Sequence, residues 1–107
     1  MSPLALQYSS DGEKIEVRNV NVPNYRAMVD ARQYEIMRAA LLRVLPNTEP
    51  GLTQPEMFNA ARAAVSSGLF PGTTHMWWVK CVQLDLEARG VLVRENAAKP
   101  LRWHRAQ

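Results

Sequence analysis

Residues 73–105 constrain the fold of this chain more than any other stretch. The hydroxyl side chains of Thr73 and Thr74 stand where a helix takes its capping residue, and the run that follows contains no proline and no glycine before Gly90. A glycine that can adopt a left-handed conformation is the usual residue just after a helix. The stretch therefore predicts one helix over residues 75–89.

Two short segments rich in β-forming residues follow that helix, at residues 91–95 and 101–105. The residues between them, 96–100, are small or polar and end in a proline. Segments of this kind joined by such a loop predict a β-hairpin, here called the wing. A helix that leads directly into a hairpin forms the end of a winged helix-turn-helix domain when two other helices precede it.

The first of these earlier helices is predicted over residues 31–45. Asp30 is a suitable N-cap, Gln33 occupies the reciprocal position of a capping box, and Pro46 cannot continue a helix. Apolar side chains recur between these limits at helical spacing, as expected for a helix with one buried face. They are Tyr34, Met37, Leu41, Val44 and Leu45.

The second helix is predicted over residues 54–66. Thr53 and Glu56 form a capping box, and Pro55 lies in the first turn, where its missing N–H costs nothing. Leu52, just before the box, is expected to supply the short strand that winged helices place between their first two helices. Leu69 and Phe70, in the connection to the third helix, are expected to fill the core.

These elements together predict an α+β, mainly helical fold, a winged helix-turn-helix domain over residues 26–107 with three helices and a C-terminal β-hairpin. Residues 1–12 are expected to form a flexible leader. Residues 13–25 are expected to form an extended β-arm, because apolar and polar side chains alternate there. No hairpin partner for the arm is evident, so we expect it to pair with a second copy in a homodimer or, as the competing outcome, to dock on the edge of the wing.

The predicted core is centred on the third helix. A helical projection places Trp77, Cys81 and Leu84 on one apolar stripe. Trp77 and Trp78 point about 100° apart, so we expect Trp77 to anchor the core and Trp78 to meet the wing or a partner. Trp103 is expected to close the core from the wing. The full predicted core is Tyr34, Met37, Leu41, Phe58, Trp77, Cys81, Leu84 and Trp103.

The wing carries all of the chain's formal net charge of +3. From Val91 onward four basic side chains stand against Glu95 alone, while the preceding residues balance. Such a local excess suits a phosphate backbone, and it equally suits a solvated edge strand that charge protects from aggregation. The four basic residues are Arg94, Lys99, Arg102 and Arg105.

The solvent face of the third helix is expected to carry Met76, Lys80, Gln83 and Glu87. Lys80 and Gln83 have the chemistry to hydrogen-bond guanine and adenine edges, and the start of the helix suits phosphate contacts. Met76 and Glu87 weaken this interpretation because a major-groove reader usually offers more positive charge. The residues expected to contact double-stranded DNA are Thr73, Thr74, His75, Lys80, Gln83, Arg94, Lys99, Arg102 and Arg105.

The sequence therefore predicts a winged-helix binding module, with two uses left open. One is a DNA-binding transcriptional regulator, whose affinity would fall steeply with salt. The other is protein contact or a structural role without nucleic acid, which would survive moderate salt and use an exposed aromatic side chain such as Trp78.

We expect no enzyme, because the sequence contains no glycine-rich phosphate loop, paired-acid arrangement or Ser/His/Asp pattern. Cys81 is the only cysteine and is expected to be a small core hydrophobe rather than a nucleophile. His75 and His104 lack a partnering carboxylate motif, so neither a metal nor a cofactor is expected. The single cysteine and the absence of a signal sequence or long apolar run suggest a protein of the cytoplasm.

Five short motifs stand out along the chain. They are E-K-I-E-V-R-N-V-N-V-P at residues 13–23, L-T-Q-P-E-M at 52–57, F-P-G at 70–72, W-W-V-K at 77–80 and K-P-L-R-W-H-R at 99–105. Together they resemble the motifs of a family of small, uncharacterised bacterial proteins. The likeness covers most of the chain, and it implies the winged-helix layout without implying an activity.

Overall fold

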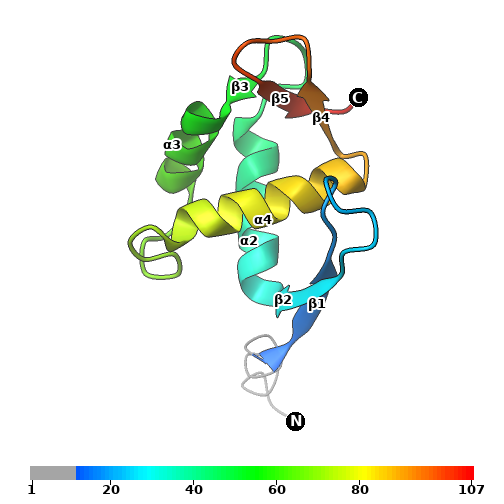
Figure 1. Cartoon of the computed structure of the whole chain (residues 1–107). Coiled ribbons are helices and arrows are strands. Elements are labelled where there is room, and N and C mark those ends of the chain that lie inside the picture. Colours follow the sequence, from blue (N-terminus) through cyan, green and yellow to red (C-terminus); the bar gives the residue numbers. More distant parts are fainter. Residues whose placement is uncertain (1–11) are drawn as a thin grey trace.

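The computed structural model describes residues 12–107, and the predicted leader therefore lies almost entirely outside the described residues. This part of the chain is α+β, with three helices and two small antiparallel sheets (Figure 1). The elements in chain order are β1 (Lys14–Val17), β2 (Ala27–Asp30), α2 (Ala31–Val44), β3 (Leu52–Thr53), α3 (Gln54–Ala64), α4 (Thr74–Ala88), β4 (Leu92–Glu95) and β5 (Arg102–Arg105).

The predicted helices are all present, and most of the predicted end signals operate as expected. Asp30 caps α2 by accepting a hydrogen bond from the Gln33 N–H, and the Thr53 capping box at the start of α3 is complete in both directions. Gly90 ends α4 with a φ of 77°, the left-handed conformation that glycine adopts readily. Two details differ. The Gln33 side chain donates to the Leu69 carbonyl instead of closing a box, and Thr73 is the N-cap of α4 without a side-chain hydrogen bond.

The C-terminal hairpin forms as predicted and belongs to a three-stranded sheet in the order β3-β5-β4. Leu52 pairs with Trp103, and Leu92 pairs with Arg105. The sheet lies at one end of α2 and α3, where Trp103 is only 4% exposed and closes the core (Figure 1). The expectations for Leu52 and Trp103 are confirmed.

The N-terminal arm differs from the prediction. Only β1 is a strand, and it pairs antiparallel with β2 of the same chain, Ile15 opposite Val29. The claim that the arm has no hairpin partner is therefore wrong, and residues 18–26 form the loop that connects the two strands. The sequence hid this hairpin because β2 is only four residues long and runs straight into α2.

The core lies between α2, α3 and α4, and α4 is rotated relative to the predicted projection. Trp78 is 8% exposed and contacts Phe70 edge to face, whereas Trp77 is 56% exposed. The prediction for the two tryptophans is thus the wrong way round, and Cys81 and Leu84 are only half-buried. The residues of α4 that are buried are His75, Trp78, Val79, Val82, Gln83, Asp85 and Leu86.

Polar groups explain this rotation. Asp85 and Gln83 are both fully buried. Gln83 Oε1 accepts from Gln54 of α3, but Gln83 Nε2 has no hydrogen-bond partner among residues 12–107. The Asp85 carboxylate accepts hydrogen bonds from the Tyr34 hydroxyl, from the Arg18 backbone N–H at 2.7 Å and from Arg89 Nε at 3.0 Å. The i, i+4 spacing of Asp85 and Arg89 in the sequence predicts this ion pair, and the pair is present. A projection that assigns Gln83 to the solvent face misses its burial, because the partner that bonds it, Gln54, lies on another helix.

Asp85 joins three elements and thereby fixes the N-terminal hairpin on the helices. Burial, and after it the hydrogen bond to Asp85, raises the pKa of Tyr34, and the bond to Asp85 also raises the pKa of Arg89. Arg89 also donates from Nη2 to the Glu16 carbonyl of β1 at 3.1 Å. The loop that follows β1 is held in this way against the outer side of α4.

Candidate binding surface

The start of α4 offers fewer polar groups to a ligand than the sequence predicts. Thr73 is exposed, and the Thr74 hydroxyl donates to the Pro71 carbonyl at 2.6 Å. His75 is only 5% exposed, with Nδ1 3.2 Å from the Gly72 carbonyl and its ring edge to face with Phe58. The His75 side chain faces the interior, and this position argues against the predicted phosphate contact.

The four residues expected on the solvent face of α4 are less exposed than predicted. Gln83 is fully buried and accepts a hydrogen bond from Gln54 Nε2 at 2.9 Å, so it cannot reach a base edge. Lys80 is half-buried and donates to Gln54 Oε1 at 3.2 Å. The Glu87 side chain is 4% exposed and pairs with Arg94. Of the four residues assigned to this face, Met76 is the most exposed, at 39%.

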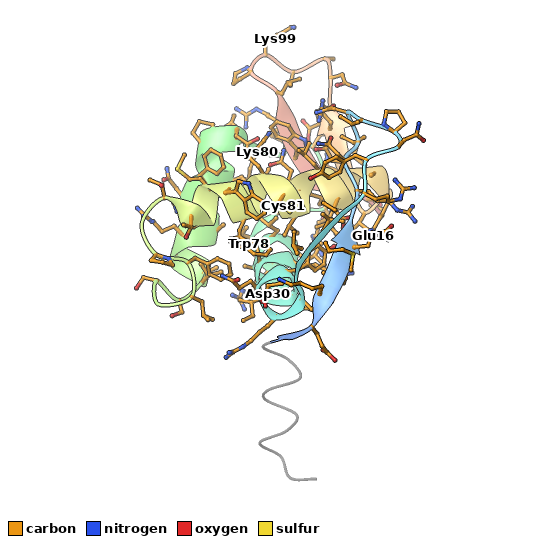
Figure 2. The ribbon with its side chains drawn as sticks, turned by 60° about the horizontal axis from the view of Figure 1, so that its bottom comes forward. Glu16, Asp30, Trp78, Lys80, Cys81 and Lys99 are labelled. Atoms are coloured by element: carbon orange, nitrogen blue, oxygen red, sulfur yellow. The ribbon has the colours of Figure 1, made fainter. Side chains whose placement is uncertain are left out.

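The basic residues of the wing are mostly engaged within the protein. Arg94 pairs with Glu87 at 2.9 Å, and Arg102 lies 3.5 Å from Glu56. Arg105 donates to the Leu45 carbonyl at 3.0 Å. Lys99 is exposed in the turn between β4 and β5 (Figure 2). A guanidinium that is already paired presents little net charge to a phosphate.

The two histidines do not form a common site. His104 Nδ1 lies 2.7 Å from Glu95 Oε2, in the three-stranded sheet, whereas the ring partner of His75 is Phe58 of α3. Among residues 12–107 no three metal-ligating side chains come close enough to hold an ion. Over the same residues no helix has the length and apolar character needed to cross a membrane.

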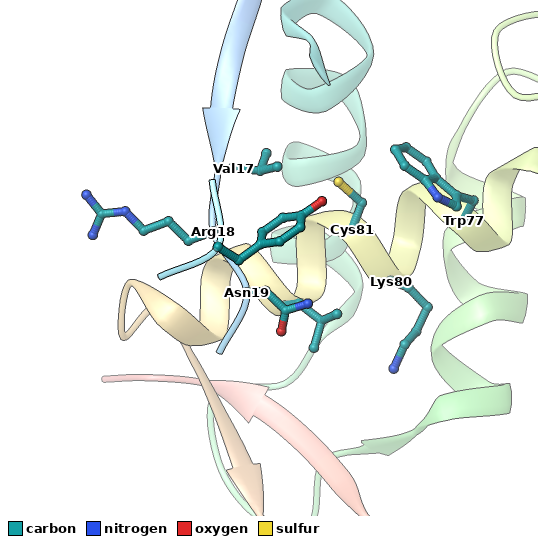
Figure 3. Close-up of a pocket in the computed structure, with 8 residues that line it drawn as sticks. Val17, Arg18, Asn19, Trp77, Lys80 and Cys81 are labelled. Atoms are coloured by element: carbon teal, nitrogen blue, oxygen red, sulfur yellow. The ribbon is translucent and has the colours of Figure 1, made fainter. Parts of the chain in front are cut away.

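The most distinctive exposed feature is an apolar surface on the outer side of α4. The exposed Trp77 and the half-buried Cys81 and Leu84 line it from the helix. The exposed Tyr25 and the buried Val17, at its base, line it from the N-terminal hairpin. We call these five residues the Trp77 surface. They line a half-open pocket of about 170 Å³, with Asn19 and Lys80 along one edge and Val17 and Cys81 along the opposite one (Figure 3).

The Trp77 surface is rigidly supported by the core. The Trp77 ring stands edge to face on the Trp78 ring, with centroids 5.0 Å apart, and Trp78 is anchored on Phe70. Burial, reinforced by the charge of Asp85, raises the pKa of the Cys81 thiol to about 11. The thiol is therefore protonated at neutral pH and is a poor nucleophile.

Sequence reasoning missed the contribution of the N-terminal hairpin to this surface. One available signal was the turn chemistry of Pro23 and Asn24, which marks a reversal of the chain just before β2. A second signal was the helical spacing of His75, Trp78, Val82 and Asp85. These residues form a stripe along the helix that is as regular as the stripe through Trp77, Cys81 and Leu84. Two parallel stripes on one helix indicate contacts on two sides.

The fold and this surface define a small α+β protein whose longest helix is covered by the core on one side and exposes aromatic and apolar side chains on the other. The chain belongs to a family of unknown function, DUF6958, whose family model matches residues 14–103. The match runs from β1 into β5 and so includes every residue of the Trp77 surface. No curated protein and no solved structure matches the chain significantly.

Proposed function

We propose that this protein is a winged-helix binding module that contacts another protein through the Trp77 surface. The winged-helix assignment is supported by the element order α2-β3-α3-α4-β4-β5 and by the strand order β3-β5-β4. The single cysteine fits a reducing compartment, so the proposal includes action in the cytoplasm of a bacterial cell.

The observation that carries the proposal is the exposure of Trp77. More than half of this large side chain faces solvent, at 56%, although the same helix buries Trp78. Tyr25, at 42% exposed, adds a second aromatic side chain to the same surface. Tryptophan and tyrosine are enriched at the centres of protein interfaces, where they supply much of the binding energy. An exposed aromatic cluster with a rigid base is therefore well suited to a protein partner.

DNA binding remains the second candidate, supported by a smaller set of residues. Lys80 keeps N–H groups that Gln54 does not use, and Thr73 and Lys99 are exposed. Lys99 has no partner among residues 12–107. These groups would contact mainly the phosphate backbone of the DNA, because Gln83, the residue expected to read adenine, is buried. A role in regulating transcription would then require other residues to recognise the DNA sequence.

A gel-shift titration with random duplex DNA separates the two candidates. At about 50 mM and at about 200 mM salt we expect no retardation of the duplex by micromolar protein, because two of the four wing cations, Arg94 and Arg102, already pair with carboxylates. The double variant Lys80→Gln/Lys99→Gln is the control, because it lacks the two lysines expected to contact DNA phosphates. Retardation at the lower salt that disappears at the higher salt and in this variant would favour DNA binding over protein contact.

The protein that binds the Trp77 surface could be a second copy of this chain. The original reason for a homodimer, an unpaired arm, no longer applies because β1 pairs with β2. The arm still offers two exposed apolar side chains for such a contact, Val20 at 39% and Val22 at 47%. Both lie in sequence between Val17 and Tyr25, which belong to the Trp77 surface. Self-association would thus use side chains rather than strand exchange.

A further inference from the structure

We propose that the pocket in the Trp77 surface binds a small aromatic carboxylate. The proposal goes beyond protein contact, since it assigns a low-molecular-weight ligand to the pocket itself. Its argument rests on the size of the pocket, on the apolar side chains that line it and on the hydrogen-bond donors along one edge.

The size and the walls of the pocket suit one six-membered ring. Its volume is about 170 Å³, and an apolar cavity of about 150 Å³ in another protein accommodates benzene. The indole of Trp77 and the side chains of Val17 and Leu84 line it, and Tyr25 supplies a second ring. Stacked or edge-to-face contacts with Trp77 and Tyr25 would favour an aromatic ring over an aliphatic one of equal size.

The polar edge of the pocket offers donors. Lys80 Nζ uses one N–H for Gln54 Oε1, which leaves two for a ligand. Asn19 Oδ1 accepts from the Asn21 backbone N–H at 2.8 Å, so the Asn19 side chain is fixed with its amide N–H groups still available. No carboxylate lines the pocket. One cation and one amide donor beside an apolar floor select a carboxylate over an amine or a neutral group.

Two other residues of the pocket have different roles. The Arg18 guanidinium extends away from Cys81 and lies 4.0 Å from Glu16, so the arginine contributes its backbone and stem rather than its charge (Figure 3). The Cys81 thiol is protonated at neutral pH because burial raises its pKa to about 11. The ligand is therefore held without a covalent bond.

Phenylacetate is a suitable probe because it joins one ring to one carboxylate. We would titrate ¹⁵N-labelled full-length protein with phenylacetate, benzyl alcohol and benzylamine, and follow the indole N–H of Trp77 and the amide N–H of Cys81 by NMR. We expect saturable shifts of these signals, with tighter binding of phenylacetate than of the other two. Lys80→Gln should weaken phenylacetate binding about three- to five-fold and leave benzyl alcohol unchanged, while Lys99→Gln should change neither.

A second pair of variants tests the ring contact. Trp77→Ala should abolish the shift of the Cys81 amide, and the neighbouring Met76→Ala should preserve it, since Met76 does not line the pocket. Equal binding of all three probes, or the same affinity in Lys80→Gln, would overturn the carboxylate assignment. Absence of saturable shifts up to about 10 mM probe would overturn the site itself.

Discussion

Replacing Asp85 with alanine is expected to lower the free energy of unfolding by about 3 kcal/mol, a large part of the stability of a domain of this size. The carboxylate is fully buried and accepts from the Tyr34 hydroxyl, the Arg18 backbone N–H and Arg89. Its removal leaves the Tyr34 hydroxyl and the Arg18 N–H without their acceptor. Urea unfolding followed by circular dichroism measures the loss.

The control for this prediction is Glu16→Ala. Glu16 pairs with Arg26 at 3.2 Å, but its side chain is 47% exposed, so the change should cost under about 1 kcal/mol. Hydrogen exchange adds a local readout, because the Arg18 amide should exchange faster in Asp85→Ala than in Glu16→Ala. If both variants unfold at the same urea concentration, Asp85 does not hold the hairpin on the helices.

Gly51→Ala is expected to destabilise the protein by about 3 kcal/mol through a clash with backbone atoms. A Cβ atom at Gly51 would lie 1.9 Å from the Trp103 carbonyl oxygen and 2.7 Å from Glu95 Oε2. The residue also donates its N–H to Glu95 Oε2 at 2.8 Å and accepts from Arg102 at 2.9 Å. Because β3 must move away from β5 to make room, the three-stranded sheet should loosen.

Gly68→Ala is the matched control, since a Cβ atom there would meet only Ser66 Oγ at 3.4 Å. We expect its unfolding free energy to lie within about 0.5 kcal/mol of the parent. Thermal unfolding of the three proteins provides the comparison. Equal midpoints for Gly51→Ala and the parent would mean that β3 and β5 separate at little cost.

The sequence was sufficient for elements whose ends carry local signals. The capping box at Thr53, the stop at Gly90 and the strand at Leu52 depend on residues close in the chain, and each is confirmed. Such signals act within one or two turns, so no knowledge of the tertiary fold is needed to recognise them. The order of helices and wing strands follows from them.

The orientation of α4 could not be found in this way. Its polar residues Gln83 and Asp85 are buried by partners distant in sequence, Gln54 and Tyr34, and its apolar Trp77 is left on the outside. Periodicity identifies apolar faces but does not say which of two faces the core will cover. The hairpin of β1 and β2 was missed for a different reason, because β2 is only four residues long and runs straight into α2. The turn at Pro23 and Asn24 was the available local signal.

The central claim, that the Trp77 surface contacts a protein, is tested most directly by photo-crosslinking in cells that naturally make this chain. A photoreactive amino acid would replace Val22, whose carbonyl accepts the Tyr25 N–H at 2.9 Å, and in a separate control it would replace the exposed Glu35 of α2. We predict a protein adduct from position 22 and none from position 35. The adduct should disappear with Trp77→Ala and persist with Met76→Ala, and an adduct of twice the chain's mass would identify a second copy as the partner. An adduct that nuclease removes, or one that Trp77→Ala leaves unchanged, would contradict the claim.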